Sequence, residues 1–277
     1  MALEPGLYVA ATPIGNLKDV TRRVVETLKE ADLILCEDTR QTAKLCAAYG
    51  IATRRAPYHD YNADRVRPGI LEKLRAGAAI ALVSDAGTPL ISDPGYKLIR
   101  AARDAGVRVF PLPGPSAVIA ALSASGAPTD RFLFAGFPPP RAGARAEFLN
   151  DLAPIRATLV FYETALRLAC SLSAMAETLG DRRAVVAREL TKLHEDIREA
   201  RLSELAAHYS QAPPKGEIVV IVHPPEEKRV GEDELDAFLE KALGAMSVRD
   251  AVAAAAETLG ISRRQAYERA LQMRSRR

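Results

Sequence analysis

The sequence predicts an α/β protein with two α/β domains and a small all-α extension at the C-terminal end. Short runs rich in valine, isoleucine and leucine alternate with stretches of helical period, which is typical of strands and helices around a mostly parallel sheet. Three prolines within residues 111–115 interrupt this alternation, because each proline removes an amide donor and fixes the backbone. We therefore expect domains at residues 1–113 and 114–226, and a helical tail at residues 232–277.

Four strands and three helices are expected in the first domain. One helix is marked at both ends, with Asp93 as its N-cap, Pro94 at the first helical position and Gly106 after the last. The expected strands are 7–11, 32–36, 79–84 and 107–111, and the other two helices are 20–30 and 42–49.

The second domain is expected to begin with an alanine-rich helix from Ser116. The run 137–140 contains three prolines and is expected to be a loop, because proline cannot donate a backbone hydrogen bond. A helix at 166–179 should end at Gly180. The expected strands are 132–134, 158–162, 184–188 and 217–223, and residues 224–228 are expected to form a linker.

The tail contains three helical patterns and an excess of arginine. Residues 247–250 and 262–265 both fit a capping box, and Gly260 should end the helix between them, which gives a helix-turn-helix-like pair. Residues 263–277 include six arginines against the single acid Glu268, a composition suited to phosphate. A packed helical hairpin with a solvated basic surface explains the same pattern.

Composition indicates a soluble globular protein, with 48% hydrophobic and 26% charged residues in 277. The net charge of +3 is too small to indicate a nucleic-acid-binding protein by itself. No apolar run is long enough to span a membrane, and residues 1–6 lack the features of a secretory signal, so we expect a cytoplasmic protein. Three cysteines without CxxC spacing predict neither disulfides nor a zinc site, and we expect buried or half-buried reduced thiols.

Polar loops follow three of the predicted strands, at residues 12–17, 37–40 and 84–89. Ligands bind at the carboxyl ends of strands in open α/β sheets, so the three loops are expected to share one edge and one site. In the third loop, Asp85 supplies an acceptor, Gly87 permits close backbone approach and Thr88 supplies a hydroxyl, which suits an amino-acid-like ligand. Neither GxGxxG nor a P-loop is present, and each loop taken alone also fits a simple turn with a helix cap.

Eight blocks of sequence occur in a specific order. They are TPIGNLKDVT (12–21), EDTR (37–40), HDYN (59–62), LVSDAGTPLISDPG (82–95), PLPGPSAVIAAL (111–122), FYE (161–163), RELTKLHE (188–195) and KGEIV (215–219). This order resembles the tetrapyrrole methylase superfamily and, within it, the ribosomal RNA small subunit methyltransferase I family. The resemblance covers residues 7–222. It departs from the family at Thr164–Arg167, where members carry a serine and a His-Arg pair, and at Arg141, where lysine is common.

The resemblance implies two domains of the tetrapyrrole methylase type, with S-adenosylmethionine folded in the cleft between them. It also implies the activity, which is 2′-O-methylation of a cytidine in the 16S rRNA of the small ribosomal subunit (cytidine 1402 in the decoding centre), by a homodimer without a metal. Carried over residue by residue, the cofactor contacts are Ile14, Asp85, Thr88, Ser116, Ala117, Tyr162, Leu190 and Gly216.

Methyl transfer to a ribose hydroxyl benefits from a base, because the protonated hydroxyl is a poor nucleophile. Candidates are Glu37, Asp38, His59 and Lys192, and we favour Asp38, with Arg40 positioning the RNA. A lysine base requires a lowered pKa, to which Arg188 could contribute. Ion pairs between Asp38 and Arg40, or between Glu37 and Lys192, are the structural alternative.

Substrate contacts are expected from His59, Asn62, Arg141 and Arg145. The arginines, with Lys192 and the tail, would bind phosphates, and Tyr58, His59 or Tyr61 would stack on a displaced base.

Two other functions compete with this interpretation. A methyltransferase acting on a tetrapyrrole would share the fold and the cofactor, but it should have a GxGPGD-type first loop, which residues 12–17 lack. A non-catalytic ribosome-associated RNA-binding protein would keep the fold without binding the cofactor, and the intact run of cofactor-loop residues argues against it. A calorimetric titration with S-adenosylmethionine separates this last case from the other two.

Overall fold

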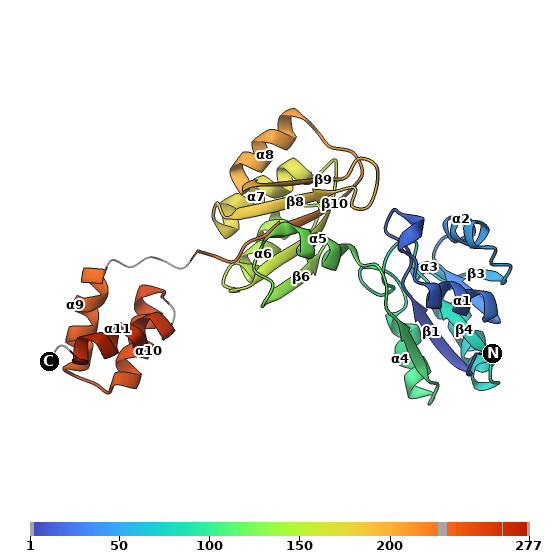
Figure 1. Cartoon of the computed structure of the whole chain (residues 1–277), viewed down its shortest axis with the longest axis horizontal. Helices are drawn as coiled ribbons and strands as arrows, with labels where there is room; N and C mark the ends of the chain where they lie inside the picture. The colour runs from blue at the N-terminus through green and yellow to red at the C-terminus, as the bar shows by residue number, and fades with distance from the viewer. Residues whose placement is uncertain (1–2, 227–231, 262, 276–277) are drawn as a thin grey trace. The chain divides into compact units, whose positions relative to one another are not determined.

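A parallel sheet of five strands forms the first part of the protein, in a computed structural model that describes residues 3–226, 232–261 and 263–275. The strands are β1 (Gly6–Ala10), β2 (Leu33–Cys36), β3 (Arg55–Pro57), β4 (Ala79–Leu82) and β5 (Val109–Leu112). Their order is β3-β2-β4-β1-β5 and every pairing is parallel, which confirms the predicted sheet type (Figure 1). The sequence analysis missed β3, because its three residues include an arginine and a proline and form no apolar run.

Helices cover both faces of this sheet. They are the 3-10 helix η1 (Leu17–Asp19), α1 (Arg22–Glu30), α2 (Thr39–Tyr49), α3 (Asp60–Arg75) and α4 (Tyr96–Asp104). Leu28 of α1 and Leu45 of α2 pack with Tyr8 of β1 on one face. Leu74 of α3 and Leu98 of α4 pack with Leu7 on the other. Successive residues of a strand face opposite sides, so β1, β2, β4 and β5 contribute to both cores.

The expected start of α4 is wrong. Gly95 is the N-cap, with φ 135°, and the helix begins at Tyr96 rather than after Asp93. A residue with this φ cannot continue a helix, so Asp93 and Pro94 remain in the preceding loop. The expected end is confirmed, because the helix stops before Gly106, which has φ 72°.

The second sheet is mixed rather than mostly parallel. Its strands are β6 (Phe132–Gly136), β7 (Thr158–Thr164), β8 (Arg183–Arg188), β9 (Asp196–Arg201) and β10 (Glu217–Val222), in the order β6-β7-β10-β8-β9. Only β6 and β7 pair in parallel. A short loop joins β8 to β9, and so short a connection permits only antiparallel pairing.

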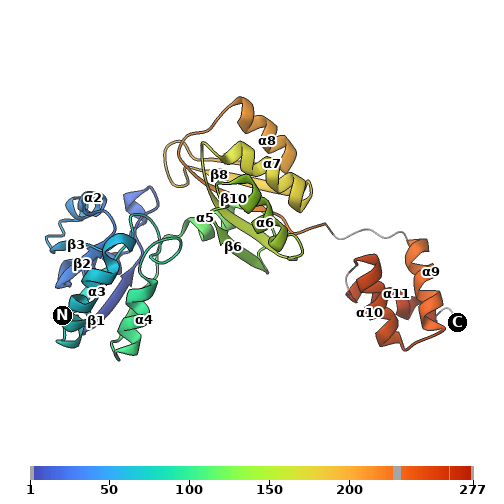
Figure 2. The same cartoon turned by 180° about the vertical axis from the view of Figure 1, so that it is seen from behind.

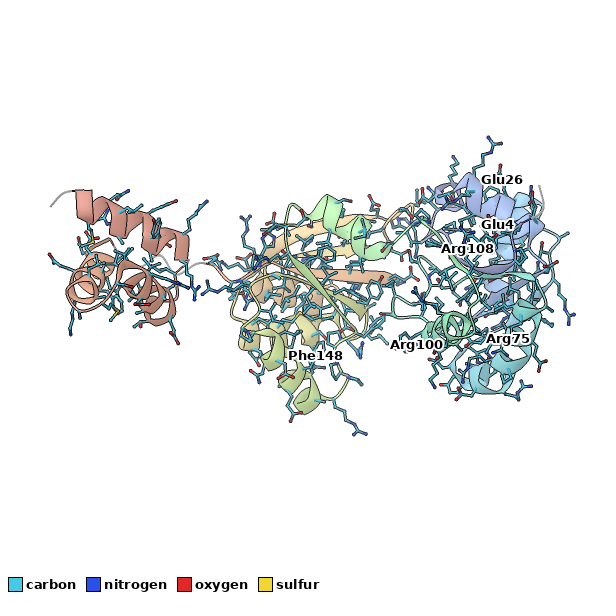
Figure 3. The ribbon with its side chains drawn as sticks, turned by 90° about the horizontal axis from the view of Figure 1, so that it is seen from below. Glu4, Glu26, Arg75, Arg100, Arg108 and Phe148 are labelled. Carbon is cyan, nitrogen blue, oxygen red and sulfur yellow. The ribbon has the colours of Figure 1, made fainter. Side chains whose placement is uncertain are left out.

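Four helices pack on this second sheet. They are α5 (Ala117–Ser125), α6 (Ala142–Leu152), α7 (Leu168–Leu179) and α8 (Leu202–Gln211). Leu149, Leu172 and Leu205, from α6, α7 and α8, belong to one core, whereas Val118 of α5 belongs to the core on the other face. Phe148 of α6, labelled in Figure 3, packs edge-on at 6.3 Å from Phe161 of β7.

The contacts divide the chain into two compact units, Met1–Pro224 and Pro225–Arg277 (Figure 2 shows the chain from behind). The second unit contains α9 (Glu232–Leu243), α10 (Val248–Leu259) and α11 (Arg263–Ser275), with a core of its own that includes Leu239 and Ala255. The three predicted helices are therefore confirmed. The further boundary expected at residue 113 stays a prediction.

The ends of α10 also agree with the sequence. The Ser247 side chain accepts from the backbone of Asp250, and Gly260 ends the helix with φ 67°. The cap expected at Ser262 lies outside the described residues. Arg269, one of the arginines expected to be exposed, is instead 17% exposed and binds Asp236 with an Nη2–Oδ2 distance of 2.6 Å.

Two further expectations concern cysteines and membranes. Cys36 and Cys46 are buried, as expected, whereas Cys170 is exposed, because its position on α7 faces away from the core. Within residues 3–226, 232–261 and 263–275, the helices are too short or too polar to cross a bilayer.

Candidate functional site

The three polar loops meet at one edge of the first sheet, as the sequence predicted. The strands that precede them, β2, β4 and β1, are neighbours in the sheet. Thr12 and Gly87 exchange backbone hydrogen bonds of 2.8 and 3.0 Å, and the Asp38 amide donates to Asp85 Oδ1 at 3.0 Å. Asp85 therefore fastens the second loop to the third.

A cavity of about 300 Å³ opens beside two of these loops. Seven of the eight residues predicted to contact a cofactor line it, namely Ile14, Thr88, Ser116, Ala117, Tyr162, Leu190 and Gly216. Asp85 does not line this cavity, and neither does the loop 37–40. The volume is within the range of small-ligand sites.

Apolar and aromatic side chains form much of the cavity surface. Ile14, Ala187, Leu190 and Val219 belong to the buried core beneath it. Tyr162 lies between two phenylalanine rings, with centroid distances of 4.8 Å to Phe134 and 5.5 Å to Phe137. Such a surface suits the flat ring of a nucleobase.

Two glycines bring backbone close to neighbouring atoms at the cavity. Gly87 has φ 81°, and a Cβ on it would lie 3.3 Å from Ile14 Cγ2. Gly216 has φ 93°, and a Cβ there would collide with the carboxylate of Glu189. Larger residues at either position would strain the backbone and displace the cavity wall.

Backbone strain is concentrated at the same place. In the described part of the chain, the non-glycine residues with positive φ are Leu90 (75°), Ser92 (65°), Glu189 (52°) and Thr191 (67°). All four belong to two loops that supply cavity residues, including Ser92 itself. Such conformations cost about 1–3 kcal/mol each and cluster at functional sites, where surrounding structure maintains them.

Asp93 is a cavity residue that the sequence analysis interpreted only as a helix cap. Burial, followed by the charges of Glu37 and Asp85, raises its pKa to about 6, although a hydrogen bond with Ser84 acts in the opposite direction. Burial and the Asp93 charge also raise the pKa of Tyr162 to about 12. The signal that could have revealed Asp93 was a second acid in the loop that contains Asp85.

The EDTR loop contains the Asp38–Arg40 ion pair, which was the structural alternative to Asp38 as a base, with an Nη2–Oδ2 distance of 2.9 Å. Hydrogen bonds from the side chain and backbone of Arg40 lower the pKa of Asp38. Glu37 behaves differently, because burial and the charge of Asp85 raise its pKa. Of the two acids, Asp38 is therefore the weaker base.

Lys192 pairs with Glu189 at 2.8 Å and with Glu217 at 2.9 Å, and not with Glu37 as the structural alternative supposed. Burial acts to lower its pKa, but hydrogen bonds to the two carboxylates outweigh this, and the pKa is raised. The lowered pKa that a lysine base requires is thus absent.

The predicted substrate residues are dispersed. Asn62 is buried and completes the N-terminal cap of α3, accepting from the His59 amide at 3.0 Å. Arg145 is also buried, and its guanidinium donates to the carbonyl of Pro140 at 3.2 Å, whereas Arg141 is exposed at the start of α6. None of these four residues lines the cavity.

The two tyrosines considered for base stacking differ sharply. Tyr58 is 1% exposed and part of the core, so the expectation that it could stack on a base is wrong. Tyr61 is 99% exposed, and its ring lies edge-on to His59 at 6.1 Å.

A buried carboxylate lies beside the cavity at Glu163, which the sequence analysis quoted only as part of a block. Its side chain accepts from the Thr164 amide at 2.6 Å and from Ser171 Oγ at 2.5 Å. It also pairs with Arg167 at 2.7 Å, and Arg167 donates to the carbonyl of Pro138. Arg167 belongs to the segment Thr164–Arg167, which departs from the family pattern, and it forms an ion pair with Glu163.

Comparison with known proteins places this geometry in a family. The family model "Tetrapyrrole (Corrin/Porphyrin) Methylases" matches residues 6–206, and the model "RsmI C-terminal HTH domain" matches residues 229–274. A protein of Mesorhizobium japonicum named ribosomal RNA small subunit methyltransferase I is 48% identical over 274 residues, which cover 98% of this chain and 93% of the relative.

Solved structures share the fold at lower identity. Diphthine synthase has a TM-score of 0.62 and 16% identity, over 78% of this chain and 89% of the other. The uroporphyrin-III C-methyl transferase of Thermus thermophilus, complexed with S-adenyl homocysteine, has a TM-score of 0.53 and 20% identity, over 78% of this chain and 97% of the other.

The names of these two enzymes indicate different substrates, so the fold alone does not identify the molecule that accepts the methyl group. The matches in sequence are more specific, because they extend through both compact units of the chain. The chain belongs to the tetrapyrrole methylase family and, within it, to the ribosomal RNA small subunit methyltransferase I family.

Proposed function

We propose that this protein transfers the methyl group of S-adenosylmethionine to the 2′-hydroxyl of a cytidine in 16S rRNA, cytidine 1402. The observation that carries the proposal is the cavity, which brings together Ile14, Thr88, Ser116, Ala117, Tyr162, Leu190 and Gly216 from distant parts of the sequence. These are seven of the eight residues to which the resemblance assigns contacts with the cofactor.

The cavity fits this cofactor in its chemistry. When bound, S-adenosylmethionine supplies a methyl group already activated by a sulfonium. Ile14, Ala187 and Leu190 offer an apolar surface for a nucleobase, while Thr88 and Ser116 offer hydroxyl groups. Thr88 Oγ1 donates to the carbonyl of Pro115 at 3.1 Å, so this side chain also holds the third loop against the segment that begins α5.

We propose Asp93 as the acceptor of the hydroxyl proton. It lines the cavity, and its pKa of about 6 leaves the carboxylate ionised but still basic at neutral pH. Asp38 lacks this property, because Arg40 lowers its pKa, and Lys192 is held protonated by two carboxylates. Asp38, Arg40 and Asp85 are then positioning residues that join the loops.

We propose the remaining assignments on the resemblance and on the charges of the residues concerned. Arg141, Lys192 and the basic surface of the tail would contact RNA phosphates, with His59 and Tyr61 near the displaced nucleotide. The acceptor would be 16S rRNA within the small ribosomal subunit, so the protein would act in the cytoplasm. A homodimer is proposed on the resemblance alone, and sedimentation of the purified chain tests it.

The test combines cofactor binding with mapping of the product. Calorimetric titration of the full chain with S-adenosylmethionine should show saturable binding near one equivalent. Small subunits from a strain lacking the gene should then gain one 2′-O-methyl group when enzyme and cofactor are added. Saturable binding without methylation would reject the acceptor, and absence of binding would reject the enzyme.

A further inference from the structure

A second cavity, of about 560 Å³, lies at the end of the second sheet. Its polar surface comes from β8, the loop after β8, β9, α8 and the turn before β10. Figure 1 labels these strands and this helix. The side chains that matter are Arg188, His194, Arg198, His208, Tyr209 and Lys215. Neither the resemblance nor the first cavity assigns a function to this group.

The charge of this cavity is predominantly positive. Its two carboxylates are already engaged, since Glu189 binds Lys192 at 2.8 Å and Asp196 lies 4.0 Å from Arg188. Over the described ranges of the chain, Arg198 and Lys215 make no ion pair. Two permanent cations at this hollow therefore have no ion-pair partner, which favours an anionic ligand.

Tyr209 adds a hydrogen-bond donor to this surface. The residue is only 4% exposed, and its hydroxyl lies beside Arg198 without a well-formed hydrogen bond. A tyrosine hydroxyl is protonated at neutral pH, and burial raises its pKa further. A buried hydroxyl without a good partner is costly, and an anionic oxygen in the cavity would satisfy it once the side chains over it make room.

The second cavity borders the same two chain segments as the first. Leu190 and Gly216 line the first cavity, whereas their neighbours Arg188, Glu189 and Lys215 line the second. The first cavity lies on the α5 face of the second sheet and the second cavity on the α8 face, so an RNA strand whose target ribose enters the first would pass round the end of the sheet to place a phosphate in the second.

We propose that the cavity bounded by Arg188, Arg198, Tyr209 and Lys215 binds a phosphodiester of the RNA strand that carries the target nucleotide. This inference rests on the proposed function for the identity of the strand. Arginine and lysine supply the charge that RNA backbones require, and tyrosine supplies a neutral donor.

The test replaces the two unpaired cations in the full chain, as R198A/K215A. Affinity for small ribosomal subunits is measured by filter binding at several salt concentrations. Each phosphate contact on a single strand contributes about 0.7 to the slope of log K against log salt, so loss of this one phosphodiester contact should make the slope less steep by about 0.7. Affinity at about 100 mM salt should fall at least about tenfold, and KM for subunits should rise with kcat nearly unchanged.

Two further variants control this experiment. K73A/R75A removes the same two charges from the last turn of α3, where both side chains are exposed, and should leave the slope nearly unchanged (Figure 3 labels Arg75). R198K/K215R keeps both charges and should restore most of the affinity. Equal slopes for R198A/K215A and the native protein, or an equal change in K73A/R75A, would overturn the proposal.

An experiment with inorganic phosphate distinguishes an RNA ligand from a small free anion. Stabilisation of the native protein by phosphate, lost in R198A/K215A without any change in RNA affinity, would identify a site for a small anion and reject the RNA contact. Titration with S-adenosylmethionine is run in parallel, and its affinity should be the same in the variant. The slopes of the native protein and R198A/K215A could differ as expected while the native protein does not methylate the RNA. That result would reject the proposed function and retain this site.

Discussion

Asp93 shows how the surroundings of one side chain can determine its chemistry. Burial and the neighbouring carboxylates Glu37 and Asp85 all disfavour its ionised form, and the pKa rises to about 6. Asp38 has the same functional group, yet hydrogen bonds from Arg40 lower its pKa. The two carboxylates are thereby suited to different tasks, one to accept a proton and the other to hold a loop.

We predict that replacing Asp93 with asparagine lowers kcat by about 10²–10⁴-fold, the usual contribution of a positioned base, with little change in cofactor affinity. The native rate should rise with pH and level off above about 6, because the base must be ionised. Steady-state kinetics from pH 5 to 9 measure both effects.

Asp151→Asn is the matched control for this experiment, since Asp151 is exposed on α6. A native profile without an inflection near pH 6, or a D93N enzyme of native activity, would exclude Asp93 as the base.

At the scale of single residues, sequence patterns located the loops better than the chemistry within them. Asp85, Gly87 and Thr88 could be placed at a strand end because an apolar run precedes them. The environment of Asp93 could not be foreseen, because it depends on Glu37 and Tyr162, which are distant in sequence. The pairing of Lys192 with Glu217 likewise depends on the antiparallel order of the second sheet.

At the scale of elements, Glu163 connects strand β7 to helix α7. Its carboxylate is 3% exposed and binds Ser171 and Arg167 of the following segment. Arg167 in turn contacts the proline loop at Pro138, which precedes α6. The network therefore joins the proline loop, β7 and the start of α7 on one side of the first cavity.

We predict that E163Q lowers the free energy of unfolding by about 1–3 kcal/mol, because a buried charge-assisted hydrogen bond is lost and Arg167 loses its partner. Urea unfolding at pH 7 measures this change. E177Q, at an exposed position of α7, should differ from the native protein by less than about 0.5 kcal/mol. Equal stability of the two variants would contradict a structural role for Glu163.

A strand could be predicted from the sequence when its residues form a clear apolar run. The central strands β1, β2, β4, β7, β8 and β10 are apolar runs, and all were expected. The missed strand β9 has the sequence DIREAR, whose charges suit an edge strand but conceal it from a search for apolar runs. Helix α3 contains Pro68 and Gly69, which interrupt its helical pattern.

At the scale of the whole molecule, the two compact units have separate cores. The core of the second unit consists of tail residues such as Leu235, Leu239 and Ile261, and the cores of the first unit include none of them. Folding of the part of the chain that forms the first cavity is therefore expected not to require the tail. Arg263 and Arg264 are exposed on α11 and available to phosphates.

We predict that removing residues 232–277 leaves the affinity for S-adenosylmethionine within about twofold but weakens binding to small ribosomal subunits at least about tenfold, through lost phosphate contacts. Calorimetry and filter binding measure the two affinities. Equal subunit binding with and without these residues would show that the tail serves packing alone.

The segment Arg188–Leu190 borders both cavities, with Glu189 held by Lys192 and placed against Gly216. A shift of this segment on occupation of one cavity must alter the shape of the other. Thermodynamic linkage makes such an effect reciprocal, so RNA should change the affinity for the cofactor by the factor by which the cofactor changes the affinity for RNA. The strained backbone at Glu189 and Thr191 lies at this shared border, where any such coupling would have to pass.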